Sequence, residues 1–180
     1  MRKLYAVVGM SGSGKSIATD YLESIGYNKI YFGGLIYKKM REENIEITPD
    51  SQKVYRENLR KKYGMAAVAI LLLDEIEESY KNGPTVIDGL YSWDEYLVLK
   101  EKFGEDLKLI CICANKNIRY ERVAKRVDRP FNRHDIEIRD LSEIENLAKG
   151  GPIAYADYYI LNNSGVDEYL EQLKKILEEV

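Results

Sequence analysis

Short apolar runs alternate along this chain with longer stretches of helical periodicity. The runs have the length of buried strands and occupy residues 4–8, 29–32, 85–88, 108–113 and 157–161. Helical patterns occupy residues 15–24, 35–43, 50–63, 65–81, 92–103, 116–127, 136–149 and 166–179. Because strands that alternate with helices build a parallel sheet covered on both faces, we predict a three-layer α/β fold with a five-stranded parallel sheet.

Glycine and proline mark the breaks in this pattern. Gly64 interrupts the helical stretch between Pro49 and Asn82, and Asn82-Gly83-Pro84 ends it before the third strand. The chain has 180 residues, enough for one domain with a sizeable core and few for two, and it shows no internal repeat or low-complexity linker. We therefore predict one domain over residues 1–180.

Composition narrows the choice of partners. The net charge of −3 argues against a general nucleic-acid binder, and the 45% of hydrophobic residues indicates a globular protein. The longest apolar stretch, Met65–Leu73, is far shorter than a membrane span, and the first apolar run is too short for a signal peptide. We expect a cytoplasmic protein without a membrane partner, and the sequence leaves its oligomeric state open.

The two cysteines, Cys111 and Cys113, alternate within one apolar run. On a strand their side chains point the same way, but this spacing is poor geometry for a disulfide. We interpret them as core thiols in a reducing compartment.

The most informative motif is Gly-Met-Ser-Gly-Ser-Gly-Lys-Ser at residues 9–16, which follows the first strand and opens the first helix. Its glycines let successive backbone N–H groups converge on phosphate oxygens, and the helix start adds a positive dipole. Lys15 is expected to reach the β- and γ-phosphates of a nucleoside triphosphate, and the Ser16 hydroxyl to ligate Mg²⁺. The predicted nucleotide contacts are Gly9, Ser11, Gly12, Ser13, Gly14, Lys15, Ser16 and Ile17.

Asp88 ends the apolar run Thr85-Val86-Ile87. In a parallel sheet this places a carboxylate at the same edge as the phosphate loop. It can hold Mg²⁺, usually through water, or accept a proton from an attacking group. The alternative is a cap for the turn that follows.

A run of cations lies between residues 119 and 139, and consists of Arg119, Arg122, Lys125, Arg126, Arg129, Arg133 and Arg139. Arg122 and Arg126 share a helix face, and Pro130 ends the helix after Arg129. Guanidinium groups match the spread charge of a transferring phosphoryl group, so we predict a lid in which Arg122, Arg126 and Arg129 act. The alternative is a solvated charged face.

The second strand leads into Gly33-Gly34, where a ligand can approach the backbone closely. Lys38 and Arg41 follow on a helix and are candidates for contact with an acceptor phosphate. Arg56 and Arg60, four residues apart on the next helix, could close on the same phosphate. An ordinary turn with surface cations explains these residues equally well.

These pieces, in this order, resemble the nucleoside-monophosphate kinase branch of P-loop proteins. The loop is similar to that of adenylate, cytidylate and dephospho-coenzyme A kinases. The segment 33–41 resembles the acceptor-binding segment of small archaeal-type kinases, and 119–129 resembles their lid. Residues 156–163, Ala-Asp-Tyr-Tyr-Ile-Leu-Asn-Asn, resemble a run of dephospho-coenzyme A kinases. With Gly-Pro-Ile-Ala before them, they also resemble a group of adenylate-kinase-related proteins.

The resemblance implies a P-loop NTPase fold with an acceptor-binding insertion over about 33–81 and an arginine-rich lid over about 126–145. It implies ATP and Mg²⁺ as cofactors, and a small nucleotide as the acceptor. The implied roles place Arg122 over the donor base, Arg126 and Arg129 at the transferring group, Arg139 late in the lid and Asn163 near the donor adenine. The implied acceptor contacts are Gly34, Lys38, Arg41, Arg60 and Asp88.

Two departures leave the acceptor open. Leu35 stands where adenylate kinases usually have an acid, and Lys38 stands where they have an arginine. A GTP-dependent switch fits poorly, because Ile118 occupies the position of the base-reading aspartate. We therefore expect an ATP-dependent nucleotide kinase, and the open alternative is a nucleotide-binding regulatory ATPase with little turnover.

Overall fold

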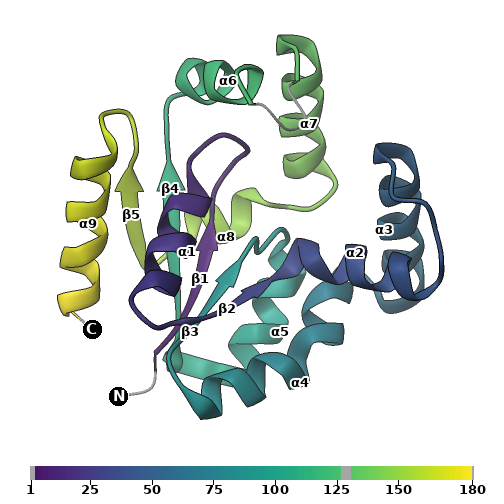
Figure 1. Ribbon diagram of the computed structural model, residues 1–180, viewed down its shortest axis with the longest axis horizontal. Helices are drawn as coiled ribbons and strands as arrows, with labels where there is room; N and C mark the ends of the chain where they lie inside the picture. The colour runs from purple at the N-terminus through teal and green to yellow at the C-terminus, as the bar shows by residue number, and fades with distance from the viewer. Residues whose placement is uncertain (1–2, 127–130, 180) are drawn as a thin grey trace.

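The computed structural model describes residues 3–126 and 131–179 and is built around a five-stranded sheet. All its strands are parallel, in the order β2-β3-β1-β4-β5 (Figure 1). The strands are β1 (Leu4–Val8), β2 (Asn28–Tyr31), β3 (Thr85–Asp88), β4 (Leu107–Cys113) and β5 (Tyr158–Leu161). The predicted parallel α/β fold is confirmed, with each strand within one residue of its predicted start.

Helices cover both faces of this sheet. On one face, α1 (Lys15–Ser24) and α9 (Val166–Glu179) pack against alternate residues of β1 and β4, such as Val7 and Ile110. On the other, α2 (Phe32–Glu42), α4 (Ala67–Asn82) and α5 (Trp93–Phe103) pack against the residues between them, such as Ala6 and Leu109. Side chains that alternate across the strands therefore form two apolar clusters, one on each side.

The remaining helices lie near the ends of the sheet or beyond it. They are α3 (Pro49–Tyr63), the short 3-10 helix η1 (Gly104–Asp106), α6 (Lys116–Ala124), α7 (Arg133–Glu145) and α8 (Gly150–Ala154). In Figure 1, β4 points toward α6, and α7 stands beside α6 above the carboxyl edge of the sheet. Across the described residues, no helix has both the length and the apolar character needed to cross a membrane.

Local chemistry explains most helix boundaries. Gly64 separates α3 from α4 with a φ of 81°, a conformation that favours glycine, so the predicted break is confirmed. The Ser92 hydroxyl accepts a hydrogen bond from the Glu95 N–H, and the Glu95 carboxylate accepts from the N–H groups of Tyr91 and Ser92, which fixes the start of α5.

Three predicted helices have a boundary that differs from the structure by three residues or more. Helix α2 begins at Phe32 rather than residue 35, because Gly33 and Gly34 leave room for the ring of Tyr31 against its first turn. Helix α6 ends at Ala124 rather than residue 127. The helix predicted over 136–149 runs from Arg133 to Glu145, and the separate helix α8 was not predicted.

The outer edge of β5 meets a side chain of α9. The Gln172 amide accepts a hydrogen bond from the Leu161 N–H (3.1 Å) and donates one to the Leu161 carbonyl oxygen (3.2 Å). One side chain thus satisfies both backbone groups, as a sixth strand would.

Candidate phosphate-binding and transfer site

The loop between β1 and α1 has the backbone that phosphate binding requires. Gly9, Gly12 and Gly14 have φ angles of 147°, 80° and 100°, all in the region that favours glycine. A Cβ atom at Gly12 would lie 2.6 Å from the Arg119 carbonyl oxygen, and one at Gly14 would clash with the Asn162 side chain. The loop is therefore held closely by α6 and by the turn after β5.

Lys15 lies back across this loop. Its Nζ donates hydrogen bonds to the carbonyl oxygens of Gly9 (2.8 Å) and Met10 (3.1 Å). Burial, together with the positive charge of Lys149, lowers the pKa of Lys15 to about 7. An ammonium group held only by two carbonyl oxygens can exchange them for phosphate oxygens.

The other predicted loop residues surround this lysine. Ser11 and Ser13 are buried, Ser16 is exposed at the start of α1, and Ile17 is half-buried against the core of that face. Within the described part of the chain, the buried Ser13 hydroxyl has no hydrogen-bond partner. An unsatisfied buried hydroxyl in a phosphate loop is a polar group that a ligand can satisfy.

Asp88 ends β3 at the carboxyl edge of the sheet, in register with Val7 of β1 and Tyr31 of β2. Burial raises the pKa of Asp88, whereas the positive charges of Lys29 and Lys15 oppose that rise. The Ser16 hydroxyl and the Asp88 carboxylate are oxygen donors, which Mg²⁺ prefers, so this pair fits the predicted ion.

Arg122 is tied to the loop through Asn162. The Arg122 guanidinium donates to the backbone oxygen of Asn162 (2.9 Å) and to its Oδ1 atom (3.3 Å). Asn162 in turn donates from Nδ2 to the Ser13 carbonyl oxygen (2.8 Å). Asn163 instead accepts a hydrogen bond from the Asn115 N–H (2.8 Å), which joins the turns after β5 and β4. Sequence reasoning selected Asn163 and missed the loop-contacting Asn162.

One arginine of the cation run makes structural contacts, whereas its neighbours are predicted to act on the transferring phosphoryl group. Arg119, 7% exposed, donates to the Ser11 carbonyl oxygen (2.8 Å) and to both carboxylate oxygens of Asp140 (3.2 and 2.6 Å). It therefore ties α7 to the phosphate loop. Arg126 is exposed beyond α6, and Arg129 lies outside the described residues.

The acceptor-side cations are split between two helices. Lys38 and Arg41 are exposed on α2, while Arg56 and Arg60 are half-buried on α3. Burial, followed by the charge of Arg60, lowers the pKa of Arg56. Gly34 lies in the first turn of α2. The structure thus brings Arg56 and Arg60 together, and it places Lys38 and Arg41 on the exposed side of their helix.

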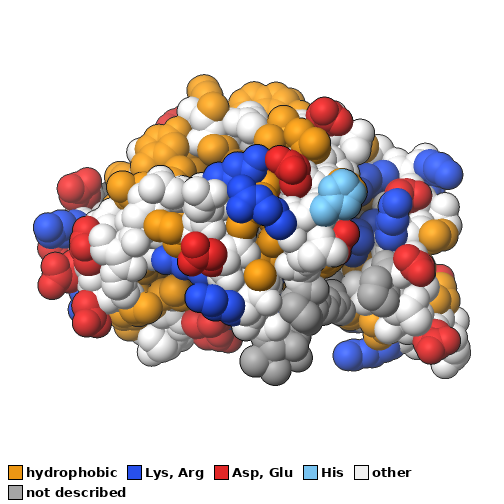
Figure 2. All heavy atoms as spheres, turned by 90° about the horizontal axis from the view of Figure 1, so that it is seen from above, with side chains coloured by type: hydrophobic (Ala, Val, Ile, Leu, Met, Phe, Trp, Pro, Cys, Tyr) orange, Lys and Arg blue, Asp and Glu red, His pale blue; other side chains and the backbone are white. Residues whose placement is uncertain are grey.

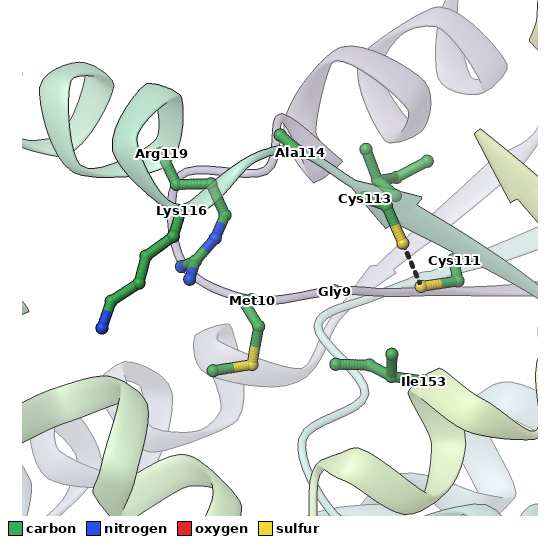
Figure 3. Close-up of a pocket in the computed structure, with 9 residues that line it drawn as sticks. Gly9, Met10, Cys111, Cys113, Ala114, Lys116, Arg119 and Ile153 are labelled. Carbon is green, nitrogen blue, oxygen red and sulfur yellow. Dashed lines mark hydrogen bonds between the residues drawn. The ribbon is translucent and has the colours of Figure 1, made fainter. Parts of the chain in front are cut away.

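A cavity of about 250 Å³ opens beside the loop, on the side of β4 that faces α8. Figure 3 shows Met10, Arg119 and Ile153 around it, with the two cysteines at one end. The Sγ atoms of Cys111 and Cys113 lie 3.5 Å apart, and both cysteines are free, as predicted. Figure 2, seen from above, shows one group of Lys and Arg side chains near the middle of this face and others toward its left and right sides.

This sheet order and this loop define a protein of the P-loop NTPase fold. A family model described as an AAA domain matches residues 6–146. A UPF0200 protein of Thermococcus onnurineus is 31% identical over 178 residues, which cover 97% of this chain and 96% of that protein. The chain therefore belongs to the AAA-domain family of P-loop proteins, together with the UPF0200 proteins.

Solved structures show the same fold. TT1252 from Thermus thermophilus matches with a TM-score of 0.68 and 17% identity, over 99% of this chain and 97% of that one. A dephospho-CoA kinase from Campylobacter jejuni matches with a TM-score of 0.58 and 15% identity, over 98% and 96%. The predicted resemblance to P-loop kinases is thereby confirmed for the family and the fold.

Proposed function

We propose that this chain is an ATP-dependent kinase that transfers the γ-phosphate to a nucleotide-like acceptor, such as AMP, another nucleoside monophosphate or dephospho-coenzyme A. The observation that carries the proposal is the phosphate loop, in which the Lys15 ammonium rests on two carbonyl oxygens of the loop. Donor phosphates would replace those oxygens and accept hydrogen bonds from the converging backbone N–H groups.

In this proposal Ser16 and Asp88 hold Mg²⁺, with the remaining positions taken by phosphate oxygens and water. The ion, when bound, supplies positive charge against the phosphates. Asp88 also lies where it can orient the attacking group of the acceptor. Its half-buried position limits access of water to that carboxylate.

The arginines would act around the donor and the transferring group. Arg122 is already fixed beside the loop by Asn162, which favours a role in holding the donor nucleotide, with Asn163 near its adenine. Arg126 is exposed and free to turn toward the transferring phosphoryl group, and Arg129 shares that proposed role. Guanidinium groups that engage only in the transition state raise kcat rather than affinity.

On the acceptor side, the pair Arg56 and Arg60 supports an anionic substrate, because two half-buried guanidinium groups side by side repel each other until an anion arrives. Gly34, Lys38 and Arg41 remain proposed contacts that require the acceptor to reach α2. One kinase with this fold is the dephospho-CoA kinase from Campylobacter jejuni, and dephospho-CoA is also a nucleotide-like acceptor.

The test is ADP release from ATP·Mg²⁺ in the presence of AMP, CMP, UMP, GMP, their deoxy forms or dephospho-coenzyme A. A kinase should release ADP much faster with one acceptor than without any. The variant Lys15→Ala should lose that activity, and Lys81→Met, which removes an exposed cation of α4, should keep it. Slow release that no acceptor stimulates would contradict the proposal and favour a regulatory ATPase.

A further inference from the structure

A lysine that the proposed function does not use is buried close to the phosphate loop. Lys149 precedes α8 and is 1% exposed. Its Nζ donates to one carboxylate oxygen of Glu143 (2.7 Å), and the Arg139 guanidinium donates to the other (3.0 Å). One buried carboxylate of α7 therefore holds two cations, one on its own helix and one from the segment before α8.

The position of this cluster links it to both substrates. The Lys149 ammonium lies 5.1 Å from the ring centre of Tyr91, which follows Asp88 by three residues. After burial, the charge of Lys149 is the main cause that lowers the pKa of Lys15, so the two ammonium groups are close in space. Burial raises the pKa of Glu95 to about 7, and the hydrogen bonds from the N–H groups of Tyr91 and Ser92, followed by the charges of Arg60 and Lys149, oppose that rise. Lys149 therefore lies near the phosphate-loop lysine and the turn that follows Asp88.

Two cations share one carboxylate in this region. The charged groups that act on Lys15 are the cations Lys149 and Arg139 and the carboxylates of Glu143 and Asp88, and the Glu95 carboxylate also acts on Lys149. A buried ammonium group is costly unless it is paired, and this one shares the Glu143 carboxylate with Arg139. A phosphate group carries more negative charge than a carboxylate and can accept hydrogen bonds from both cations at once.

We infer that Lys149 and Arg139 bind the phosphate group of the acceptor. The Glu143 carboxylate occupies the position of that phosphate until the phosphate displaces it. The identification of this phosphate as part of an acceptor rests on the proposed kinase function, whereas the binding of an anion at this site does not require turnover. The exchange would leave α7 in place, because the Lys149 N–H still donates to the Glu143 carbonyl oxygen (3.2 Å) and Arg119 still holds α7 to the loop.

Inorganic phosphate is the first probe, titrated calorimetrically into Lys15→Ala protein so that binding at the phosphate loop is weakened. Adding Lys149→Met should reduce phosphate affinity about 10-fold or more, because a charge-assisted hydrogen bond is lost. Adding Glu143→Gln should instead raise it several-fold, because the competing carboxylate charge is gone. The matched control, Lys81→Met, removes one exposed positive charge and should leave phosphate affinity unchanged.

The opposite directions separate a binding role from a structural one. A merely structural ion pair would give two less stable proteins with equal effects on phosphate, or none. Unchanged affinity in Lys149→Met, or reduced affinity in Glu143→Gln, would overturn the inference, as would the absence of phosphate binding in Lys15→Ala protein.

Turnover then distinguishes this inference from the proposed function. With any acceptor that stimulates ADP release, Lys149→Met should raise the KM for that acceptor about 10-fold and change the KM for ATP less than twofold. An equal rise in the KM for ATP would place Lys149 on the donor and refute the acceptor assignment. If no acceptor stimulates the unmodified protein, the kinase proposal fails, and the phosphate titration still decides the anion site.

Discussion

The contact between Arg119 and Asp140 should be among the most important for stability in this chain. It joins α6 to α7 across 21 positions of sequence, and the two side chains are only 8% and 9% exposed. The substitution Asp140→Ala removes both carboxylate oxygens and leaves the guanidinium with the Ser11 carbonyl oxygen as its remaining acceptor among the described residues.

The expected loss follows from these bonds. Two hydrogen bonds to a charged group at about 1.5–3 kcal/mol each give about 3–6 kcal/mol. Breaking a buried ion pair by removing one partner costs about 3–5 kcal/mol, so we take about 4 kcal/mol as the expected loss. For a chain of this size that loss corresponds to a fall in Tm of about 8–16 °C.

Urea unfolding followed by circular dichroism measures this loss. Glu145→Ala, which removes an exposed carboxylate from the same helix, is the control and should change stability by less than about 0.5 kcal/mol. The double variant Arg119→Met with Asp140→Ala should lose less than the sum of its parts, because no unpaired charge remains buried. A loss below about 1 kcal/mol in Asp140→Ala would refute the reasoning.

Four further outcomes are expected. Lys15→Ala should nearly abolish ATP turnover with an unchanged circular dichroism spectrum, and an unaffected rate would remove the case for the phosphate loop. Because burial lowers the pKa of Lys15 to about 7 and phosphate binds the protonated form, ATP affinity measured by calorimetry should fall as pH rises above 7, by up to about 10-fold per unit. Lys15→Arg, which stays charged, should flatten that profile. Gly14→Ala, at a φ of 100° and against Asn162, should destabilise the protein by about 1–3 kcal/mol in urea unfolding. Arg126→Ala should lower kcat with little change in the KM for ATP. A change in KM alone, measured by steady-state kinetics, would contradict this prediction.

The sheet and the phosphate loop could be predicted because their signals are local. Strands β1, β3 and β4 are short, mostly apolar runs, and each loop residue is fixed by its place between β1 and α1. The strand after α8 carried a further signal that was not used. Ile160 is buried, so alternation along β5 points Asn162 to the same side, toward the loop, where it contacts the Ser13 carbonyl oxygen.

The buried charges could not be predicted in the same way. Arg119 was one of seven cations in a run, and its partner on α7 meets it only when the two helices pack. Glu143 and Lys149 are six residues apart, a spacing that places no two side chains on one helix face. A lone lysine before Gly150-Gly151-Pro152 was the only hint that this cation leaves the helix and turns inward.

The pairing of Gln172 with Leu161 has a consequence for how this protein is made. An exposed outer strand can recruit another chain by backbone pairing, which leads to aggregation. Here a single amide on α9 blocks that position at the tip of β5. Because α9 follows β5 in the chain, a growing polypeptide would present this edge uncovered until α9 has been synthesised and has docked. The interval between those two events is when the nascent chain would be most prone to associate with its neighbours on the same message.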